Sequence, residues 1–244
     1  MPDAGVTDTH MIDHHLENRM RRTALAFALI GAAFATAEVS AQDADRSVKD
    51  GGINVAGWKG RVDRRPAAAG KTVNDSKLVM EGSNLRLSAG PAGNFWNGAN
   101  TANGNYEVMA TFKEHKMAAS HPHSYGLFIG GKDLESDNET LMYCIVYGTG
   151  KYSIKTFHGA KVTTIVDMEE NAALKKADAN GEATNTIGWR VRDGQASCVV
   201  NGTVVKSLSK AEYAGADKLT STDGGYGIRV SHNLELTISQ IMKH

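Results

Sequence analysis

Hydrophobic and polar side chains alternate along much of this chain, with the two-residue period of a β-strand. Residues 106–112 (YEVMATF) show the alternation clearly, with apolar positions separated by small or polar ones, as in a strand with one buried face. Residues 186–192 and 196–200 repeat the pattern on either side of Asp193-Gly194. Because Asp-Gly forms tight hairpin turns, these two runs predict a pair of antiparallel strands.

Similar signals divide the rest of the chain into short strands. Asn201-Gly202 marks a second hairpin, and Gly148-Thr149-Gly150 closes a third. No βαβ spacing or internal repeat is evident, so the pattern predicts an all-β fold, a two-sheet antiparallel β-sandwich. The strands are expected at residues 57–63, 78–80, 85–87, 95–96, 106–112, 125–129, 141–147, 152–157, 161–166, 186–192, 196–200, 203–205, 226–230 and 234–241.

Two segments depart from the strand pattern. Residues 64–70 are rich in Pro, Ala and Gly, and we expect a loop there. Residues 171–185 have helical composition but are polar and interrupted by Gly181. We therefore predict a surface insertion with one helical turn at most.

The N-terminal part of the chain has the pattern of an export signal. Met20-Arg21-Arg22 precedes an apolar run at residues 23–37, and Val39-Ser40-Ala41 fits a small-residue cleavage site. The alternative is a membrane anchor, for which the run is short. We expect residues 1–41 to be an upstream extension and signal peptide that is cleaved after Ala41. Residues 42–56 are expected to be a flexible segment, and residues 57–244 a single β-sandwich domain. The product would then be secreted or periplasmic, without a membrane span.

Composition narrows the classes of function. The 27 basic and 27 acidic side chains balance, so no electrostatic reason exists to expect nucleic acid as a partner. A length of 244 residues suffices for one all-β domain with a core of its own. The 26 glycines fit a fold with many turns.

The chain has two cysteines, Cys144 and Cys198. An oxidising compartment would permit a disulfide between them. Both lie in apolar runs, YCIV and SCVV, and two buried free thiols are the alternative. The sequence does not set the Cα separation, and both interpretations stay open.

Four segments together resemble a known superfamily: YGLFIGGKDL, YCIVYGTGKYSIK, WRVRDGQASCVVNGTVV and GGYGIRVSHNLEL. With the earlier GWKGRVD, they are similar to concanavalin A-like lectins and glucanases, and in particular to exported bacterial laminin-G-like domains of the 3-keto-disaccharide hydrolase type. The resemblance spans residues 57–244 and implies a jelly-roll sandwich. That superfamily includes lectins, glycosidases and adhesive modules, so the resemblance leaves the function open.

Paired carboxylates are the first candidate chemistry. Retaining glycosidases need two carboxyl groups about 5–5.5 Å apart, and family-16 glycosidases place them in an E-x-D-x-E strand. Glu135, Asp137 and Glu139 match that pattern. The intervening residues, Ser136 and Asn138, are polar where a core-facing strand position should be apolar, which argues for a solvated loop instead.

The same segment offers hard oxygen ligands of the kind that Ca²⁺ prefers, from Asp133, Asp137 and Glu139. A Ca²⁺ site is therefore a second interpretation of this loop. His121 and His123 form an H-x-H pair that could hold a transition metal. No Cys or nearby carboxylate completes a tetrahedral ligand set around them in the sequence.

Aromatic and polar residues beside loops are the general signal for sugar binding, because sugars stack on aromatic rings and donate hydrogen bonds to polar groups. Most aromatic residues here are expected in the core, Trp189 among them. The candidate ligand-binding residues are Trp96, His121, His123, Tyr125, Lys132 and His158.

The leading hypothesis is a carbohydrate-binding, lectin-like module with a glycan as its partner. A glycoside hydrolase acting on a disaccharide or polysaccharide is the alternative, and a structural or protein-binding module of the laminin-G type is the third. Two carboxylates 5–9 Å apart in a groove would favour the enzyme. An aromatic surface without paired acids would favour the lectin.

Overall fold

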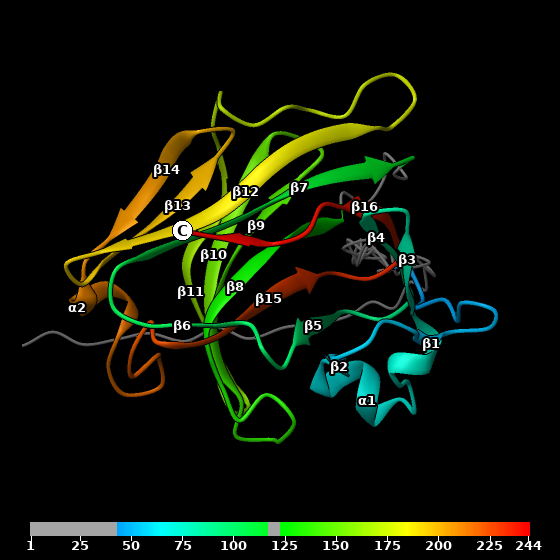
Figure 1. Ribbon diagram of the computed structural model, residues 1–244, viewed down its shortest axis with the longest axis horizontal. Helices are drawn as coiled ribbons and strands as arrows, with labels where there is room; N and C mark the ends of the chain where they lie inside the picture. The colour runs from blue at the N-terminus through cyan, green and yellow to red at the C-terminus, as the bar shows by residue number, and fades with distance from the viewer. Residues whose placement is uncertain (1–42, 117–122) are drawn as a thin grey trace, which may run out of the picture. The chain divides into compact units, whose positions relative to one another are not determined.

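The computed structural model of the protein describes residues 43–116 and 123–244. These residues form two β-sheets packed face to face (Figure 1). Strand pairing is antiparallel throughout both sheets, apart from the short parallel pair β1–β3. The all-β, two-sheet antiparallel β-sandwich predicted from the alternation of side chains is confirmed, with the strand arrangement of a jelly roll. Across the described ranges, no helix is long and apolar enough to cross a membrane.

The first sheet, sheet A, contains nine strands. Short β17 (Met242–Lys243) pairs with β7 beside the main path. In spatial order that path runs β1 (Gly52–Ile53), β3 (Lys77–Glu81), β4 (Asn84–Ala89), β16 (Leu234–Ile238), β7 (Tyr106–His115), β12 (Ala183–Arg192), β13 (Gln195–Val200) and β14 (Thr203–Leu208).

The second sheet, sheet B, contains eight strands. Short β6 (Thr101–Ala102) pairs with β15 beside the main path. In spatial order that path runs β11 (Lys161–Glu170), β10 (Lys151–His158), β9 (Thr140–Tyr147), β8 (Ser124–Lys132), β15 (Gly224–Val230), β5 (Gly93–Asn97) and β2 (Trp58–Val62). Three short helical segments lie between strands: α1 (Arg64–Ala68), η1 (Val73–Asp75) and α2 (Lys210–Tyr213).

The predicted hairpin turns form as expected. Asp193 and Asn201 adopt positive φ angles of 48° and 51°, and the glycines after them are also in the left-handed region. Two consecutive positive φ angles are what a type I′ turn requires, and its twist matches that of the flanking strands. These turns therefore fix the register of β12, β13 and β14.

Two segments differ from the sequence expectation, and a third agrees with it except at its end. Residues 64–68, expected as a loop, form the short helix α1. Residues 171–182 contain turns but no helix, in agreement with one helical turn at most, and the insertion ends at residue 182 because β12 begins at Ala183. In the segment 42–56, expected to be flexible, β1 pairs with β3, and Arg46 donates to the carbonyl oxygens of Ala89 and Leu234 at 3.0 and 2.8 Å. Backbone pairing and the hydrogen bonds of the partly exposed Arg46 thus hold the described part of this segment on the sandwich.

The space between the sheets is filled by one apolar core. Trp189 on β12 is fully buried there, as predicted, and its indole N–H donates to the Leu127 carbonyl of the opposite sheet at 3.0 Å. Cys144 on β9 and Cys198 on β13 form a disulfide, with 6.2 Å between the Cα atoms. The bond therefore links sheet B to sheet A through the core, and the interpretation as two free thiols is wrong.

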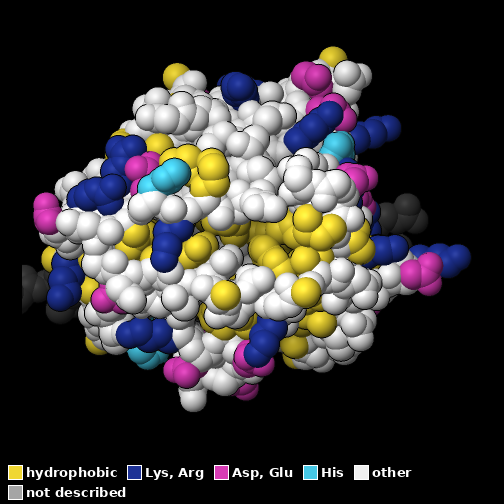
Figure 2. All heavy atoms as spheres, in the orientation of Figure 1, with side chains coloured by type: hydrophobic (Ala, Val, Ile, Leu, Met, Phe, Trp, Pro, Cys, Tyr) yellow, Lys and Arg dark blue, Asp and Glu magenta, His cyan; other side chains and the backbone are white. Residues whose placement is uncertain are grey.

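An apolar region also reaches the surface. Figure 2 shows hydrophobic side chains in a band across the middle of one face, with charged side chains scattered around it. A separate hollow of about 190 Å³ is lined by Trp58, Met80 and Ile241, among others. Met80 is 45% exposed and Met242 is 49% exposed.

Candidate functional site

The central strands of sheet B, β8 and β9, are buried on both faces, and the second face carries the candidate site. On β9, Met142, Cys144 and Val146 point into the core between the sheets, whereas Tyr143 and Ile145 point the other way. The run LMYCIVY is apolar throughout because both of its faces are covered. The face of sheet B that points away from sheet A, here called the outer face, carries a second apolar cluster: Trp96, Phe128, Leu134, Leu141, Tyr143, Ile145 and Phe157.

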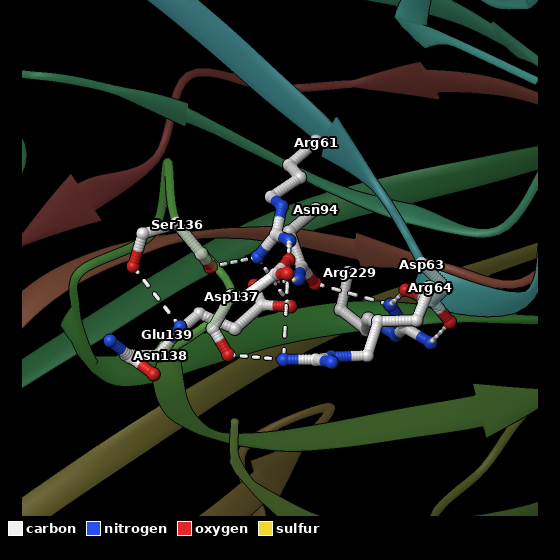
Figure 3. A network of polar contacts seen from close by, with 9 residues as sticks. All are labelled: Arg61, Asp63, Arg64, Asn94, Ser136, Asp137, Asn138, Glu139 and Arg229. Atoms are coloured by element: carbon white, nitrogen blue, oxygen red, sulfur yellow. Dashed lines mark hydrogen bonds and ion pairs between the residues drawn. The ribbon is translucent and has the colours of Figure 1, made fainter. Parts of the chain in front are cut away.

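A loop between β8 and β9 folds back over this outer face. We call residues 133–139 the acidic loop. Leu134 anchors it, because its side chain is 9% exposed and packs in the outer-face cluster. Asp133 has a φ of 52°, which turns the chain sharply at the end of β8. The rest of the loop is held by arginines that reach it from β2 and α1 (Figure 3).

Arg229 lies at the centre of the outer face. Its guanidinium forms a bidentate ion pair with Asp63, with an Nη2–Oδ2 distance of 2.6 Å, and donates to Asn94 at 3.3 Å. It also lies 5.0 Å from the ring centres of Tyr143 and Phe157, a cation–π arrangement. Burial by itself would lower the pKa of Arg229, but the Asp63 carboxylate outweighs it and raises that pKa above its usual value.

Glu139 is the buried carboxylate of the acidic loop, at 2% exposure. One oxygen lies 3.2 Å from the Arg61 guanidinium, and the other accepts from the Asn94 amide at 3.4 Å. Burial raises the pKa of Glu139, while the charge of Arg61 partly opposes the rise. Asn94 thus connects Glu139 to Arg229 in one continuous polar network, drawn in Figure 3.

The other two carboxylates of the loop form ion pairs at the surface. Asp137 pairs with Arg61, and its second neighbour Arg64 has a guanidinium nitrogen 4.0 Å from the same oxygen. Glu135 pairs with Lys59 at 2.6 Å. Both acidic side chains remain well exposed, so these contacts are in water-like surroundings.

The E-x-D-x-E segment does not lie on a strand. Residues 133–138 are in turns and bends, and β9 begins after Glu139. The three carboxylates therefore point in different directions, toward Lys59, toward Arg61 with Arg64, and into the buried network. The loop interpretation, favoured by the polar Ser136 and Asn138, agrees with this geometry. Within residues 43–116 and 123–244, no three His, Cys, Asp or Glu side chains gather closely enough to hold a metal ion.

A cleft of about 520 Å³ opens between the acidic loop and the β2–β5 side of the sheet. Its lining combines one aromatic ring with amides, hydroxyls and charges of both signs. Those side chains include Lys59, Trp96, Asn97, Asn100, Lys132 and Glu135. A second hollow of about 420 Å³ includes Asp45, Asp63, Arg65, Arg229 and His232 in its lining.

The structure brings together two of the predicted ligand-binding residues. Trp96 and Lys132 both line the 520 Å³ cleft, although only 5% of Trp96 is exposed. His158 is exposed at the end of β10, where its Nδ1 lies 2.9 Å from the Lys218 carbonyl oxygen. It is not among the residues that line the cleft.

Two predicted residues are buried instead. Tyr125 is 0% exposed and packs in the core between the sheets, so the expectation that it contacts a ligand is corrected. His123 is 5% exposed, and its ring packs edge-on against His232 with 4.6 Å between centres. Alternation along β8 explains the position of Tyr125, because Tyr125 and Leu127 both point into the core between the sheets. His121 lies outside the described residues.

Glu139 was singled out in the sequence, but its network partners Arg61, Asp63, Asn94 and Arg229 were not. Arg229 occupies the apolar run YGIRV, and its main partner Asp63 lies 166 residues earlier. The available signal was the charge itself, since an arginine inside an otherwise apolar strand needs a buried partner. Asn94 gives no comparable signal.

The chain matches no family model and no curated protein. Solved structures do share its fold. A carbohydrate-binding module, CBM66, of Bacillus subtilis aligns with 80% of this chain and 99% of its own, at 9% identity and a TM-score of 0.52. A Bacillus subtilis protein of unknown function with a galectin-like fold aligns with 77% of this chain and 88% of its own, at 11% identity and a TM-score of 0.53.

An endo-β-1,3-glucanase of Pyrococcus furiosus aligns with 80% of this chain and 90% of its own, at 10% identity and a TM-score of 0.50. At these identities the likeness shows the fold alone. It agrees with the two-sheet β-sandwich fold expected from the sequence. No sequence-level match supports the narrower laminin-G-like or 3-keto-disaccharide hydrolase type.

Proposed function

We propose that the protein binds carbohydrate in the cleft beside the acidic loop, on the outer face of sheet B. The observation that carries the proposal is the composition of that cleft. Its lining includes the aromatic Trp96, the polar Asn97 and Asn100, and the oppositely charged Lys132 and Glu135. Sugars present both C–H faces and hydroxyl groups, so they suit a site with this mixture.

The fold is compatible with the proposal. The Bacillus subtilis module and the Pyrococcus furiosus glucanase share the sandwich architecture, and their names refer to carbohydrate. Fold alone does not assign a function, because sites are built on a fold independently of it. The proposal therefore rests on the cleft residues of this chain, and the fold is only compatible with it.

Export is part of the same proposal. The N-terminal sequence has the pattern of a signal peptide. The Cys144–Cys198 disulfide is of the kind that persists in an oxidising compartment. A secreted or periplasmic protein would meet glycans of cell surfaces or of the surroundings. Fractionation of cells that produce the full chain tests this, and recovery in the cytosol would contradict it.

The binding test is a glycan array with the full chain, followed by titration of any hit into wild type and Lys132→Ala. Lys132 lines the cleft, and loss of a charged hydrogen-bond donor should weaken binding by about tenfold. Lys113→Ala is the matched control, because Lys113 lies on β7 of sheet A, where it pairs with Glu182 and does not line the cleft. Absence of binding to every glycan, or equal losses in both variants, would overturn the proposal.

Glycoside hydrolysis is the second candidate, and Glu139 is the observation that favours it. A carboxyl group whose pKa is raised by burial is suited to act as a general acid. The charge of Asp63 also raises that pKa, so a second carboxylate is nearby. Against this, Arg61 neutralises Glu139 and Arg229 neutralises Asp63.

The two carbohydrate hypotheses separate in one assay. Reducing-end release from each bound glycan should be undetectable for a binding module. If release occurs and Glu139→Gln abolishes it without weakening binding, the enzyme hypothesis replaces the lectin-like one. A laminin-G-type interaction module is the third candidate, favoured by the exposed hydrophobic side chains Met80 and Met242. A 3-keto-disaccharide substrate remains a specific form of the enzyme hypothesis.

A further inference from the structure

The contact between β2 and the acidic loop stands between the two hollows of the outer face. Lys59, Arg61 and Asp63 are alternate residues, so their side chains share one face of the chain. Lys59 lines the 520 Å³ cleft, and Asp63 lines the 420 Å³ hollow. Arg61 lies between them and pairs with Asp137 of the loop. The Arg61–Asp137 contact therefore involves a residue of β2 whose neighbours on the same face line one hollow each.

The carboxylate of Asp137 is bound in the way that proteins bind an external anion. Arg61 and Arg64 approach it from β2 and α1, and each also donates to a loop carbonyl, of Ser136 and Asp137 respectively. Figure 3 shows both guanidinium groups directed at this part of the loop. Paired guanidinium groups are suited to recognise carboxylates and sulfates because of their fixed donor geometry.

The ion pairs that Asp137 forms with Arg61 and Arg64 are weak. Its side chain is 76% exposed and that of Arg64 is 41% exposed, and exposed ion pairs contribute little in water. The buried parts of the loop do not depend on it. Leu134 packs in the outer-face cluster, and Glu139 keeps its own contacts with Arg61 and Asn94. Asp137 can therefore leave the two arginines while both ends of the loop stay in place.

We propose that Arg61 and Arg64 form a binding site for the anionic group of an acidic oligosaccharide, and that Asp137 occupies this site until such a group replaces it. The anionic group would then lie at Arg61 and Arg64, and the rest of the sugar chain would extend from there toward the cleft that Lys59 lines. The inference rests on the proposed carbohydrate-binding function and specifies its ligand class. Recognition comes from the carboxylate or sulfate at the arginines, and from neutral contacts in the hollow on either side.

The test compares three probes with the full chain at low and high salt: an oligogalacturonate, a sulfated galacto-oligosaccharide and a neutral galacto-oligosaccharide of the same length. We expect at least one acidic probe to bind about tenfold more tightly than the neutral one at low salt, with the difference lost at high salt. The acidic probe that binds identifies the anionic group as carboxylate or sulfate.

Two variants test the role of Asp137 and of the arginines. Asp137→Asn removes the internal competitor and should raise affinity for the acidic probe by several-fold, whereas Arg64→Ala should lower it. Asp217→Asn is the matched control, because Asp217 forms an exposed ion pair with Lys161 at 2.9 Å away from both hollows. Circular dichroism confirms that each variant is folded.

The outcomes separate this inference from the proposed function. Equal affinities for acidic and neutral probes, or no difference between Asp137→Asn and Asp217→Asn, would overturn the inference and leave carbohydrate binding intact. Failure of every probe and every array glycan to bind any of the proteins would overturn both. Binding of an acidic probe only in Asp137→Asn would support the inference in its strongest form.

Discussion

The disulfide between Cys144 and Cys198 makes the sharpest prediction about stability. It joins β9 to β13, and both residues are 0% exposed in the core. Replacing both with alanine keeps the neighbouring side chains and removes the covalent link between the sheets. The unfolded chain then regains the freedom that the link had removed.

The magnitude follows from the length of the closed loop. The two cysteines are 54 residues apart. The chain-entropy relation gives a loss of about 4 kcal/mol at 25 °C for a loop of that length. In a domain of roughly 200 residues, this corresponds to a fall in Tm of about 8–16 °C.

The assay is guanidinium chloride unfolding of wild type and Cys144→Ala/Cys198→Ala, followed by far-UV circular dichroism. Wild type that is reduced while unfolded serves as a control, since it carries both thiols without the link. Its free energy of unfolding should fall close to that of the double variant. A loss below about 1 kcal/mol in the double variant would refute the chain-entropy reasoning, because strain or residual structure would then dominate.

Three further predictions concern single side chains. Glu114 is 0% exposed, and burial raises its pKa to about 7, above its value in the unfolded chain. The free energy of unfolding should therefore fall as the pH rises from about 4.5 to 7. Glu114→Gln should remove this pH dependence, as measured by urea unfolding. Arg229→Met leaves Asp63 without its bidentate partner and should lower the free energy of unfolding by about 3 kcal/mol. The double variant Arg229→Met/Asp63→Asn should recover part of this loss. If the effects of the two substitutions were fully additive, the pairing would be contradicted. Gly126→Ala should cost about 2–3 kcal/mol, because its Cβ would lie 2.0 Å from the Cys144 carbonyl oxygen; an unchanged Tm would show that β8 and β9 can separate there.

Local chemistry explains why the hairpins could be predicted. Asp193 and Asn201 tolerate positive φ, and glycine follows each of them, so two adjacent residues determine the turn type. The two-residue strands β1, β6 and β17 could not be predicted in this way. Two residues carry no period, and their pairing depends on neighbours distant in the sequence.

The candidate site was predictable only in part, for the same reason. Trp96 and Lys132 were identified because aromatic and charged residues beside turns are often at the surface. Tyr125 was misplaced because the turn before it suggested exposure, whereas its register on β8 points it into the core. The apolar run around Arg229 indicates that its charge needs a buried partner, but no local pattern identifies Asp63, which lies 166 residues away.

The acidic loop shows how one motif can mislead. Its E-x-D-x-E letters match a catalytic strand, yet the polar residues between the carboxylates indicated a loop, and the structure has turns there. The sequence did not indicate that Glu139 would be buried while Glu135 and Asp137 stay exposed. That difference arises from where Arg61 and Asn94 lie on sheet B.

The central claim is that the outer face of sheet B binds carbohydrate, and amide NMR shifts during titration of an array-selected glycan test it most directly. The account predicts progressive shifts at Asn97, Asn100 and Lys132, which line the cleft. Residues on the solvent side of sheet A, such as Lys113 and Arg190, should stay unchanged. Shifts confined to sheet A, or none at saturating glycan, would contradict the claim.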